Sequence, residues 1–196
     1  MSKSREQKIN RILQASLRIL SAKGYENATI ADIAKAANVS RGILHYYFSD
    51  KEDLVSRALA SSSSSLVEDS LKAVKGNSVE EVVDGMIDAF KKNLQKNPDF
   101  YAFLFEMWCA GRRNRKIKKE LHNCSRKVVG AIKESLEIAT AKGVIEPSPH
   151  GSSETAAALL ALSDGIAFQL LNNHPENIDA KYWLPIRTMM LAVLKK

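Results

Sequence analysis

Basic and hydrogen-bonding side chains are concentrated between Thr29 and Lys51, where the apolar residues keep a helical spacing. Arg41 and His45 stand on the side of a short predicted helix that is opposite the apolar Leu44. A guanidinium or an imidazole in that position can hydrogen-bond to base edges in the major groove of DNA. The chemistry that these residues predict is therefore non-covalent recognition.

Two short helices joined by a tight turn are expected to position these side chains, within residues 30–48. The apolar face of the first helix recurs at the spacing i, i+3, i+4, i+7 and consists of Ile30, Ile33, Ala34 and Ala37. Thr29 and Asp32 form a pattern that caps a helix start, and Ser40 can cap the second helix. Asn38 suits the left-handed conformation of a sharp helix exit. These offsets predict a DNA-binding helix-turn-helix, although a generic helix hairpin could share the apolar spacing.

The run IADIAKAANVSRGILHYYFSDKEDL resembles the N-terminal DNA-binding domain of the TetR family of transcriptional regulators, and the match is specific over roughly residues 9–59. The family usually has Gly where Asn38 stands and Tyr where His45 stands. The helix positions and the resemblance together imply eight DNA-contacting residues: Thr29, Ser40, Arg41, Gly42, His45, Tyr46, Tyr47 and Lys51. We expect Arg41 and His45 to reach base edges, Gly42 to permit a close approach, and the others to touch phosphate.

Composition favours an all-α protein of about nine helices, because no convincing alternating strand is found. Residues 1–50 carry eight Lys/Arg and four Asp/Glu, a net charge of +4 out of the total of +7. This basic N-terminal segment suits a polyanion partner, although ordinary solubility charge would give the same numbers. We expect a helix-turn-helix domain over residues 1–52, beginning with a polar leader at residues 1–8, and a helical effector-binding and dimerisation domain over residues 53–196. Ser49 and Glu52 are expected to cap the helix that follows the motif.

A segment that is apolar nearly all round begins at Pro98 and ends at Gly111. Such a helix is either buried on several sides or lines a cavity. The resemblance implies an inducer pocket in the C-terminal domain, and the residues that we expect to form it are Phe100, Phe103, Phe105, Glu106, Met107, Trp108, Phe168 and Gln169. The aromatic residues suggest a hydrophobic or aromatic small-molecule inducer, and Glu106 permits a cationic one. Crowded aromatics alone are more often core than pocket, but Glu106 tips the balance slightly toward a pocket, because an unpaired carboxylate in a core would be costly.

The last two predicted helices are more apolar than one small domain needs, and the first of them is rich in small residues. The resemblance implies a homodimer joined through these helices. The expected interface residues are Ala157, Ala161, Gly165, Ala167, Met189 and Met190.

Residues 112–119 hold six Lys/Arg and no acid. This run could be a second nucleic-acid patch, but a solvated helix face is the preferred interpretation.

No Ser/His/Asp, Cys/His or paired-carboxylate constellation and no Gly-rich phosphate loop is present, so we expect neither an enzyme nor a cofactor. His122 and Cys124 are two apart on a helix and point to different faces, so we expect no metal site. The polar N-terminus and the lack of an apolar run of about 18 residues predict a cytoplasmic protein without a membrane span.

Three functions remain. The preferred one is a transcriptional repressor that a small-molecule inducer releases from an inverted-repeat operator in double-stranded DNA. The main alternative is a ligand-independent, nucleoid-associated DNA-organising protein. The third is a redox sensor that uses Cys109 and Cys124, although apolar surroundings favour inert thiols.

Overall fold

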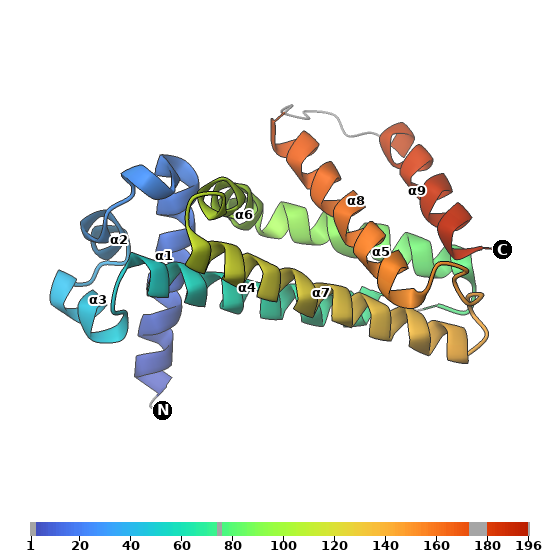
Figure 1. The fold of residues 1–196 in the computed structure, drawn as a ribbon, viewed down its shortest axis with the longest axis horizontal. Coiled ribbons are helices and arrows are strands. Elements are labelled where there is room, and N and C mark those ends of the chain that lie inside the picture. Colours follow the sequence, from blue (N-terminus) through green and yellow to red (C-terminus); the bar gives the residue numbers. More distant parts are fainter. Residues whose placement is uncertain (1–2, 74–75, 173–179, 196) are drawn as a thin grey trace. The chain divides into compact units, whose positions relative to one another are not determined.

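The fold is all-α. The computed structural model describes residues 3–73, 76–172 and 180–195, and every regular element within these ranges is a helix (Figure 1). The helices are α1 (Lys3–Asn27), α2 (Ile30–Ala36), α3 (Arg41–Tyr47), α4 (Lys51–Ala73), α5 (Val79–Lys96), α6 (Pro98–Gly111), α7 (Arg115–Ala141), α8 (Ser152–Asn172) and α9 (Ala180–Leu194). The described chain therefore has the nine helices and the N-terminal helix-turn-helix that its sequence predicts.

The described residues form two compact units. The first unit comprises the described residues within 1–63 and 98–124. The second unit comprises the described residues within 64–97 and 125–196. The first unit therefore contains α6 and the start of α7 in addition to the helix-turn-helix. The functional division after residue 52 stays a prediction, because compactness does not report which residues bind DNA or an effector.

In the first unit, α1 packs against α2 and α6. The helix begins at Lys3, so the prediction that residues 1–8 form a non-helical leader is wrong for the residues from Lys3 onward. Gly24 interrupts the helical path with φ 76° and ψ 160°, a conformation that favours glycine. The side chains of Ile12, Leu20 and Phe103 are buried in this unit.

The start of α4 differs from the predicted one by one residue. The Asp50 carboxylate accepts a hydrogen bond from the Asp53 N–H at 2.7 Å, and the Asp53 carboxylate accepts one from the Ser49 N–H at 3.1 Å. Asp50 thus caps the helix, and the predicted cap by Ser49 and Glu52 is wrong. Ser49 with Glu52 and Asp50 with Asp53 each consist of a polar residue followed by an acid three positions later. The sequence pattern alone could therefore not choose between these two pairs. The serine run at residues 61–65 is helical within α4.

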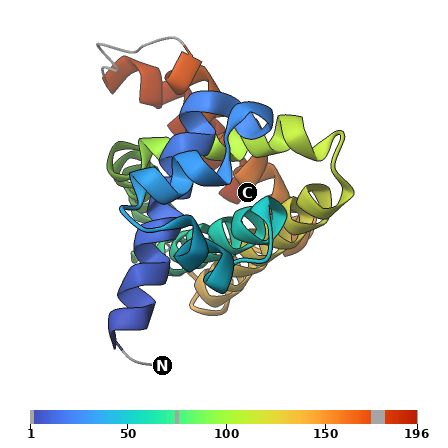
Figure 2. The same ribbon diagram turned by 90° about the vertical axis from the view of Figure 1, so that its left-hand side faces the viewer.

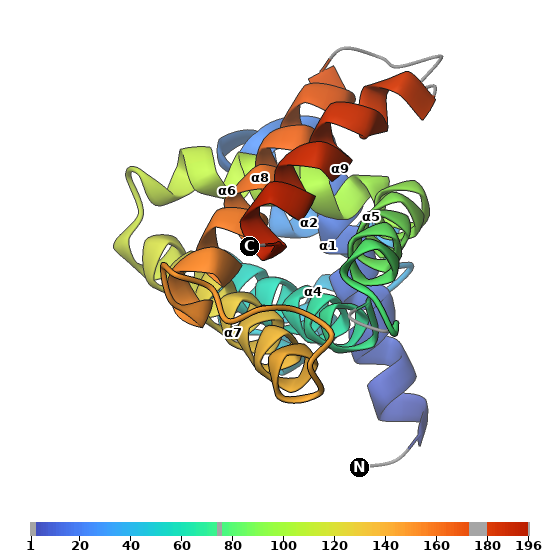
Figure 3. The same cartoon turned by 90° about the vertical axis from the view of Figure 1, so that its right-hand side faces the viewer.

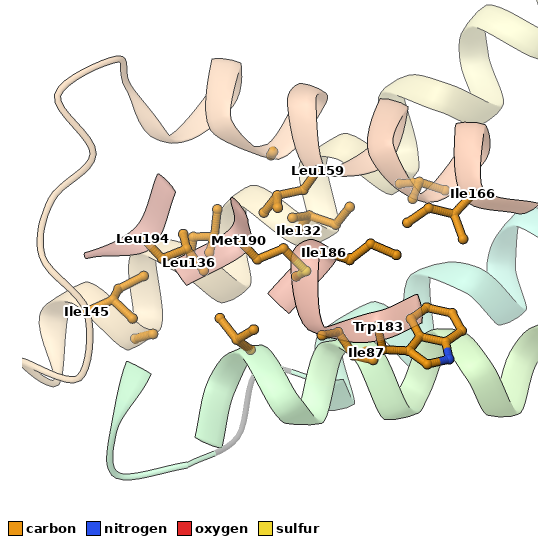
Figure 4. Close-up of a cluster of buried hydrophobic side chains, with 14 of the residues drawn as sticks. Ile87, Ile132, Leu136, Ile145, Leu159, Ile166, Trp183, Ile186, Met190 and Leu194 are labelled. Carbon is orange, nitrogen blue, oxygen red and sulfur yellow. The ribbon is translucent and has the colours of Figure 1, made fainter. Parts of the chain in front are cut away.

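The second unit is built around buried apolar side chains from α5, α7, α8 and α9 (Figure 4). Helices α5 and α9 pack together, and the rings of Phe90 and Trp183 meet edge to face at 6.1 Å. Two hydrogen bonds of 2.6 and 3.0 Å join the Arg187 guanidinium to the Asp84 carboxylate. This fork joins the same two helices at the surface.

Helix α8 contradicts one expectation, because by length and composition it is apolar enough to cross a membrane. One such helix is weak evidence for a span, since core helices of water-soluble domains meet the same criterion. Its residues Ala156, Leu159 and Leu170 are buried in the core of the second unit. Figure 3 shows α8 in orange and, nearer the viewer, α9 in red.

Candidate nucleic-acid interface

The start of α2 is fixed by a reciprocal capping box. The Thr29 hydroxyl oxygen accepts a hydrogen bond from the Asp32 N–H at 3.1 Å, and the Asp32 carboxylate accepts one from the Thr29 N–H at 3.0 Å. Lys23 lies 2.8 Å from the same carboxylate. The hydrogen bonds from Lys23 and Thr29 hold the pKa of Asp32 far below its usual range. The predicted cap is confirmed, and the Asp32 carboxylate stays ionised at any physiological pH.

The turn between α2 and α3 has the geometry that Asn38 predicts. Asn38 has φ 51°, in the left-handed region. The Val39 N–H donates to the Ala34 carbonyl at 3.0 Å and the Asn38 N–H donates to the Lys35 carbonyl at 3.1 Å. These two bonds form a Schellman motif, which ends a helix sharply. Ser40 then caps α3 by accepting a hydrogen bond from the Ile43 N–H at 3.2 Å.

Helix α3 has one buried and one exposed face. In Figure 2 the short helices α2 and α3, in light blue, lie on the side that faces the viewer. Leu44 and the following Phe48 are buried, whereas the exposed face is formed by Arg41, Gly42, His45 and Tyr46. Tyr46 is 75% exposed. Within the described part of the chain, the side chains of Arg41 and His45 make no hydrogen bond or ion pair. Their donors are therefore available to a partner molecule.

Gly42 is not required by the protein itself. A Cβ added there would meet only the Ser40 hydroxyl oxygen, at an ordinary distance of 3.9 Å. Glycine in a helix interior costs about 0.5–1 kcal/mol relative to alanine. A residue that weakens α3 without easing any internal contact is consistent with the close approach of an external backbone.

Arg5 is a candidate that the sequence interpretation missed. Its guanidinium lies over the Tyr47 ring, 5.7 Å from the centroid, and the rings of Tyr46 and Tyr47 meet edge to face at 5.1 Å. The helical start of α1 places Arg5 beside α3. Extending the helical periodicity of α1 backwards through Lys8 would have found it.

Lys51 is bound inside the first unit. Its ammonium group donates to the carbonyl oxygens of Tyr25 at 2.6 Å and Ala28 at 3.1 Å, and it lies 4.2 Å from the Tyr25 ring centroid. These contacts fix the chain between α1 and α2 against the start of α4. They use two of the three ammonium hydrogens.

A hollow of about 500 Å³ opens where α3 meets α4, lined by residues 45–50, Glu52, Asp53, Ser56, Arg57 and Lys116. Lys116 lies 2.8 Å from the Glu52 carboxylate, which also accepts a hydrogen bond from the Asn114 amide at 2.6 Å. Hydrogen bonds from Lys116 and Asn114 lower the pKa of Glu52, and Glu52 in turn raises the pKa of Lys116. The start of α7 is thereby joined to the start of α4.

The predicted pocket residues of α6 do not share one environment. Phe100, Phe103 and Met107 are buried in the first unit, whereas Trp108 is 43% exposed and meets Phe105 edge to face at 5.4 Å. Phe168 and Gln169 belong to the second unit and are exposed. That these two residues and α6 share a ligand pocket stays a prediction.

Glu106 has an internal partner. Its carboxylate accepts a hydrogen bond from the Tyr25 N–H at 2.7 Å. A Cβ added at Gly24 would lie 3.1 Å from the same carboxylate, so glycine permits this close contact between α1 and α6. Both backbone polar groups of Tyr25 are thus bound: its N–H donates to Glu106, and its carbonyl oxygen accepts from Lys51.

Some of the predicted dimer residues are exposed and the others are buried. Ala157, Ala161, Gly165 and Met189 are exposed, whereas Ala167 and Met190 are buried in the second unit. The first three lie four residues apart, on one stripe of α8. The single protomer therefore offers this stripe and Met189 to a partner, and it uses Ala167 and Met190 in its own core.

The two cysteines are free and differ in exposure. Cys109 is exposed, which the expected apolar surroundings did not predict, and Cys124 is buried. The Cys124 thiol faces the Leu59 carbonyl oxygen at 4.0 Å. This burial agrees with an inert thiol at Cys124.

Comparisons with known proteins agree on the kind of domain. Residues 12–58 match the family model described as bacterial regulatory proteins, tetR family. The uncharacterised transcriptional regulator YvdT of Bacillus subtilis is 40% identical over 55 residues, which are 28% of this chain and 28% of YvdT. The regulator UidR of Escherichia coli is 24% identical over 94% of this chain and 91% of its own length.

A solved structure shares the whole fold. The regulator FadR of Bacillus subtilis, crystallised in complex with stearoyl-CoA, superposes with a TM-score of 0.75 at 15% identity, over 94% of this chain and 97% of that one. The family match covers residues 12–58, whereas UidR and FadR, which align with nearly the whole chain, are 24% and 15% identical to it.

Proposed function

Because the chain belongs to the TetR family of DNA-binding transcriptional regulators, we propose that it is a cytoplasmic repressor which a small-molecule inducer releases from an inverted-repeat operator. The observation that supports DNA binding most directly is the exposed face of α3, where the donors of Arg41 and His45 have no partner among the described residues. Arg41 and His45 are assigned to base edges, and Ser40, Tyr46 and Tyr47 to phosphates. Gly42 lets the helix approach the groove.

Thr29 and Lys51, the two other residues proposed to contact phosphate, also make hydrogen bonds within the fold. The Thr29 hydroxyl caps α2 and also donates to Asp32 at 2.7 Å. Lys51 holds two carbonyl oxygens and has one ammonium hydrogen left for a phosphate. Replacing Lys51 by Ala should therefore weaken binding to all DNA sequences alike and also destabilise the fold.

The operator is expected to be an inverted repeat because a two-fold dimer presents two copies of α3. The proposed interface is the exposed stripe of Ala157, Ala161 and Gly165 together with Met189. Half-sites should lie about one helical turn (~34 Å) or slightly more apart.

The inducer is proposed to contact the aromatic pair of α6, which consists of the half-buried Phe105 and the exposed Trp108. A hydrophobic or aromatic ligand suits this set, and the acyl chain held by the structural neighbour FadR is one such chemistry. Movement of α6 would reach the DNA-binding helices through Glu106 and the Tyr25 N–H. A coupling of about 1–3 kcal/mol would weaken operator binding about 5- to 150-fold.

The experiment uses fluorescence anisotropy with an operator duplex obtained by selection from random DNA, titrated with hydrophobic compounds that include acyl-CoAs. Trp108→Ala should keep operator binding and lose the response to the active compound, because the side chain is exposed and its removal spares the core. Ile138→Ala removes another exposed apolar side chain, on α7, and should respond normally.

A wild-type protein that binds DNA but responds to none of the compounds would favour the ligand-independent DNA-organising alternative. An unaltered response in Trp108→Ala would remove α6 from the proposed inducer site.

A further inference from the structure

The charged surface that the helix-turn-helix does not use is the corner between α6 and α7. Six Lys/Arg occupy residues 112–119, and all six are exposed: Arg112, Arg113, Arg115, Lys116, Lys118 and Lys119. The sequence alone favoured an ordinary solvated face. The structure adds three observations that favour a partner.

The corner is held rigidly. The Arg113 and Asn114 N–H groups both donate to the Ala110 carbonyl, at 3.0 and 2.9 Å. The Asn114 side chain caps α7 by accepting hydrogen bonds from the N–H groups of Lys116 and Ile117, at 2.9 and 3.2 Å. A Cβ added at Gly111 would lie 3.0 Å from the Leu121 side chain, so α6 and α7 approach closely there. The cations therefore project from a fixed backbone.

The cations stand where the fold itself does not favour them. The first turn of α7 contains no acidic residue. Cations at a helix start oppose the helix dipole, and neighbouring cations repel one another. Within the described residues, Lys116 is the only one of the six whose charged group has an ion-pair partner, which is Glu52. An external anion would relieve this repulsion.

The corner is also continuous with the proposed DNA interface. Lys116 lines the same hollow as His45, Tyr46 and Tyr47 of α3. Three acids line this hollow, and each has an internal partner: Glu52 binds Lys116 and Asn114, Asp53 binds Arg57 at 2.9 Å, and the Asp50 carboxylate accepts a hydrogen bond from the Asp53 N–H at 2.7 Å. The remaining cations of the corner thus extend a surface that begins at the recognition helix.

We propose that the α6–α7 corner is a second DNA contact, in which Arg113, Arg115, Lys118 and Lys119 bind the phosphate backbone outside the half-site that α3 reads. This inference rests on the proposed DNA-binding function. Contacts of this kind carry no sequence information. Each makes the slope of log K against log salt more negative by about 0.9. The corner should therefore matter only where the duplex extends past the half-sites.

The test replaces the four residues with Gln in one variant, R113Q/R115Q/K118Q/K119Q, and leaves Lys116 in place because it pairs with Glu52. The control variant K92Q/K96Q/K127Q/K142Q removes the same charge from exposed lysines of the second unit. Both are titrated at several salt concentrations against a minimal selected operator and against the same operator with about one helical turn (~10 base pairs) added at each end.

The corner variant should bind the extended duplex more weakly than wild type. Its slope of log K against log salt should be less negative by about 0.9 for each phosphate that it no longer binds. On the minimal duplex it should differ from wild type no more than the control does. The charge-retaining variant R113K/R115K should keep the wild-type slope, because a phosphate contact needs charge and not a particular cation.

Equal weakening of the corner and control variants on both duplexes would overturn the proposal and leave the corner as ordinary surface charge. A corner variant whose circular dichroism shows misfolding is replaced by the pairs R113Q/R115Q and K118Q/K119Q, which are judged by the same criterion. If the wild-type protein selects no operator, the proposed function itself fails, and that outcome is distinct from a failure of the corner alone.

Discussion

Helices α3 and α6 lie in the same compact unit and use their side chains in opposite ways. On α3 the chemically versatile side chains Arg41, His45 and Tyr46 are exposed and the apolar Leu44 anchors the helix. On α6 the large apolar side chains Phe103 and Met107 are fully buried, and the carboxylate of Glu106 has an internal partner. The fold thus leaves the chemistry of α3 available to a partner, whereas it uses most of the chemistry of α6 itself.

This difference matters for how each helix can act. A helix whose donors are free can recognise an external molecule without breaking internal bonds. A helix whose side chains are buried acts on its surroundings by moving, because any shift must displace the groups packed against it. We therefore propose recognition for α3 and transmission for α6, with Trp108 as its exposed aromatic side chain.

The largest effect is expected from deleting a buried ring. Phe103→Ala should lower the free energy of unfolding by about 3–5 kcal/mol, because it leaves a cavity in the core. Tyr46→Ala should change it by less than about 0.5 kcal/mol, because Tyr46 is exposed. Urea unfolding of the two variants measures both values. A Phe103→Ala protein as stable as wild type would mean that α6 lines a cavity instead of forming core.

A smaller effect is expected at Glu106. Glu106→Ala leaves the Tyr25 N–H without its acceptor and should cost about 1–3 kcal/mol of stability. Glu106→Gln keeps a carbonyl oxygen in place and should cost much less. Thermal unfolding followed by circular dichroism separates them. Equal stability of the two variants would show that the bond to Tyr25 contributes nothing, and would restore Glu106 as a candidate ligand for a cationic inducer.

Gly42→Ala should separate folding from binding on α3. The added methyl group has room and should stabilise the helix by about 0.5–1 kcal/mol, while operator binding weakens because the helix can no longer approach as closely. Gly130→Ala on α7 is the matched control, since Gly130 is exposed and a Cβ there meets nothing within 4 Å. If both variants bind the operator as wild type does, Gly42 has no role in the interface.

How far the sequence predicted these features depends on the range of the interactions. The α2–turn–α3 geometry follows from local bonds at Thr29, Asn38 and Ser40, each of which is visible in a few consecutive residues. The Ser49 cap was assigned one residue too early because two equivalent local patterns overlap. No local pattern could show that Lys51 and Glu106 bind the same residue, because Tyr25 is 26 and 81 positions away.

The sequence of α6 shows why burial and pocket lining are hard to separate. Both require apolar side chains, and the periodicity is the same for either. The buried Phe103 and the half-exposed Trp108 could be told apart only in three dimensions. In α8, likewise, Ala161 and Ala167 have the same residue type, and only one of them is exposed.

The smallest effect is expected from His45. If its imidazolium donates to a phosphate or a base, operator binding should strengthen as pH falls from about 7.5 to 6. His45→Gln should lose this dependence while Arg41 and the rest of α3 are unchanged. Anisotropy titrations at constant salt measure the trend. A flat response in the wild-type protein would leave His45 as a neutral hydrogen-bonding residue.

Selection of binding sites from random double-stranded DNA, by the wild-type protein and by Arg41→Ala and Lys51→Ala, tests the assignment of α3 most directly. The wild-type protein should enrich an inverted repeat with half-sites about one helical turn (~34 Å) apart. Arg41→Ala should lose preference at one symmetric position at a cost of about 1–3 kcal/mol, while Lys51→Ala keeps the wild-type preferences at lower affinity. Identical preferences in the wild-type and Arg41→Ala proteins, or no enriched sequence at all, would contradict the assignment of DNA recognition to the exposed face of α3.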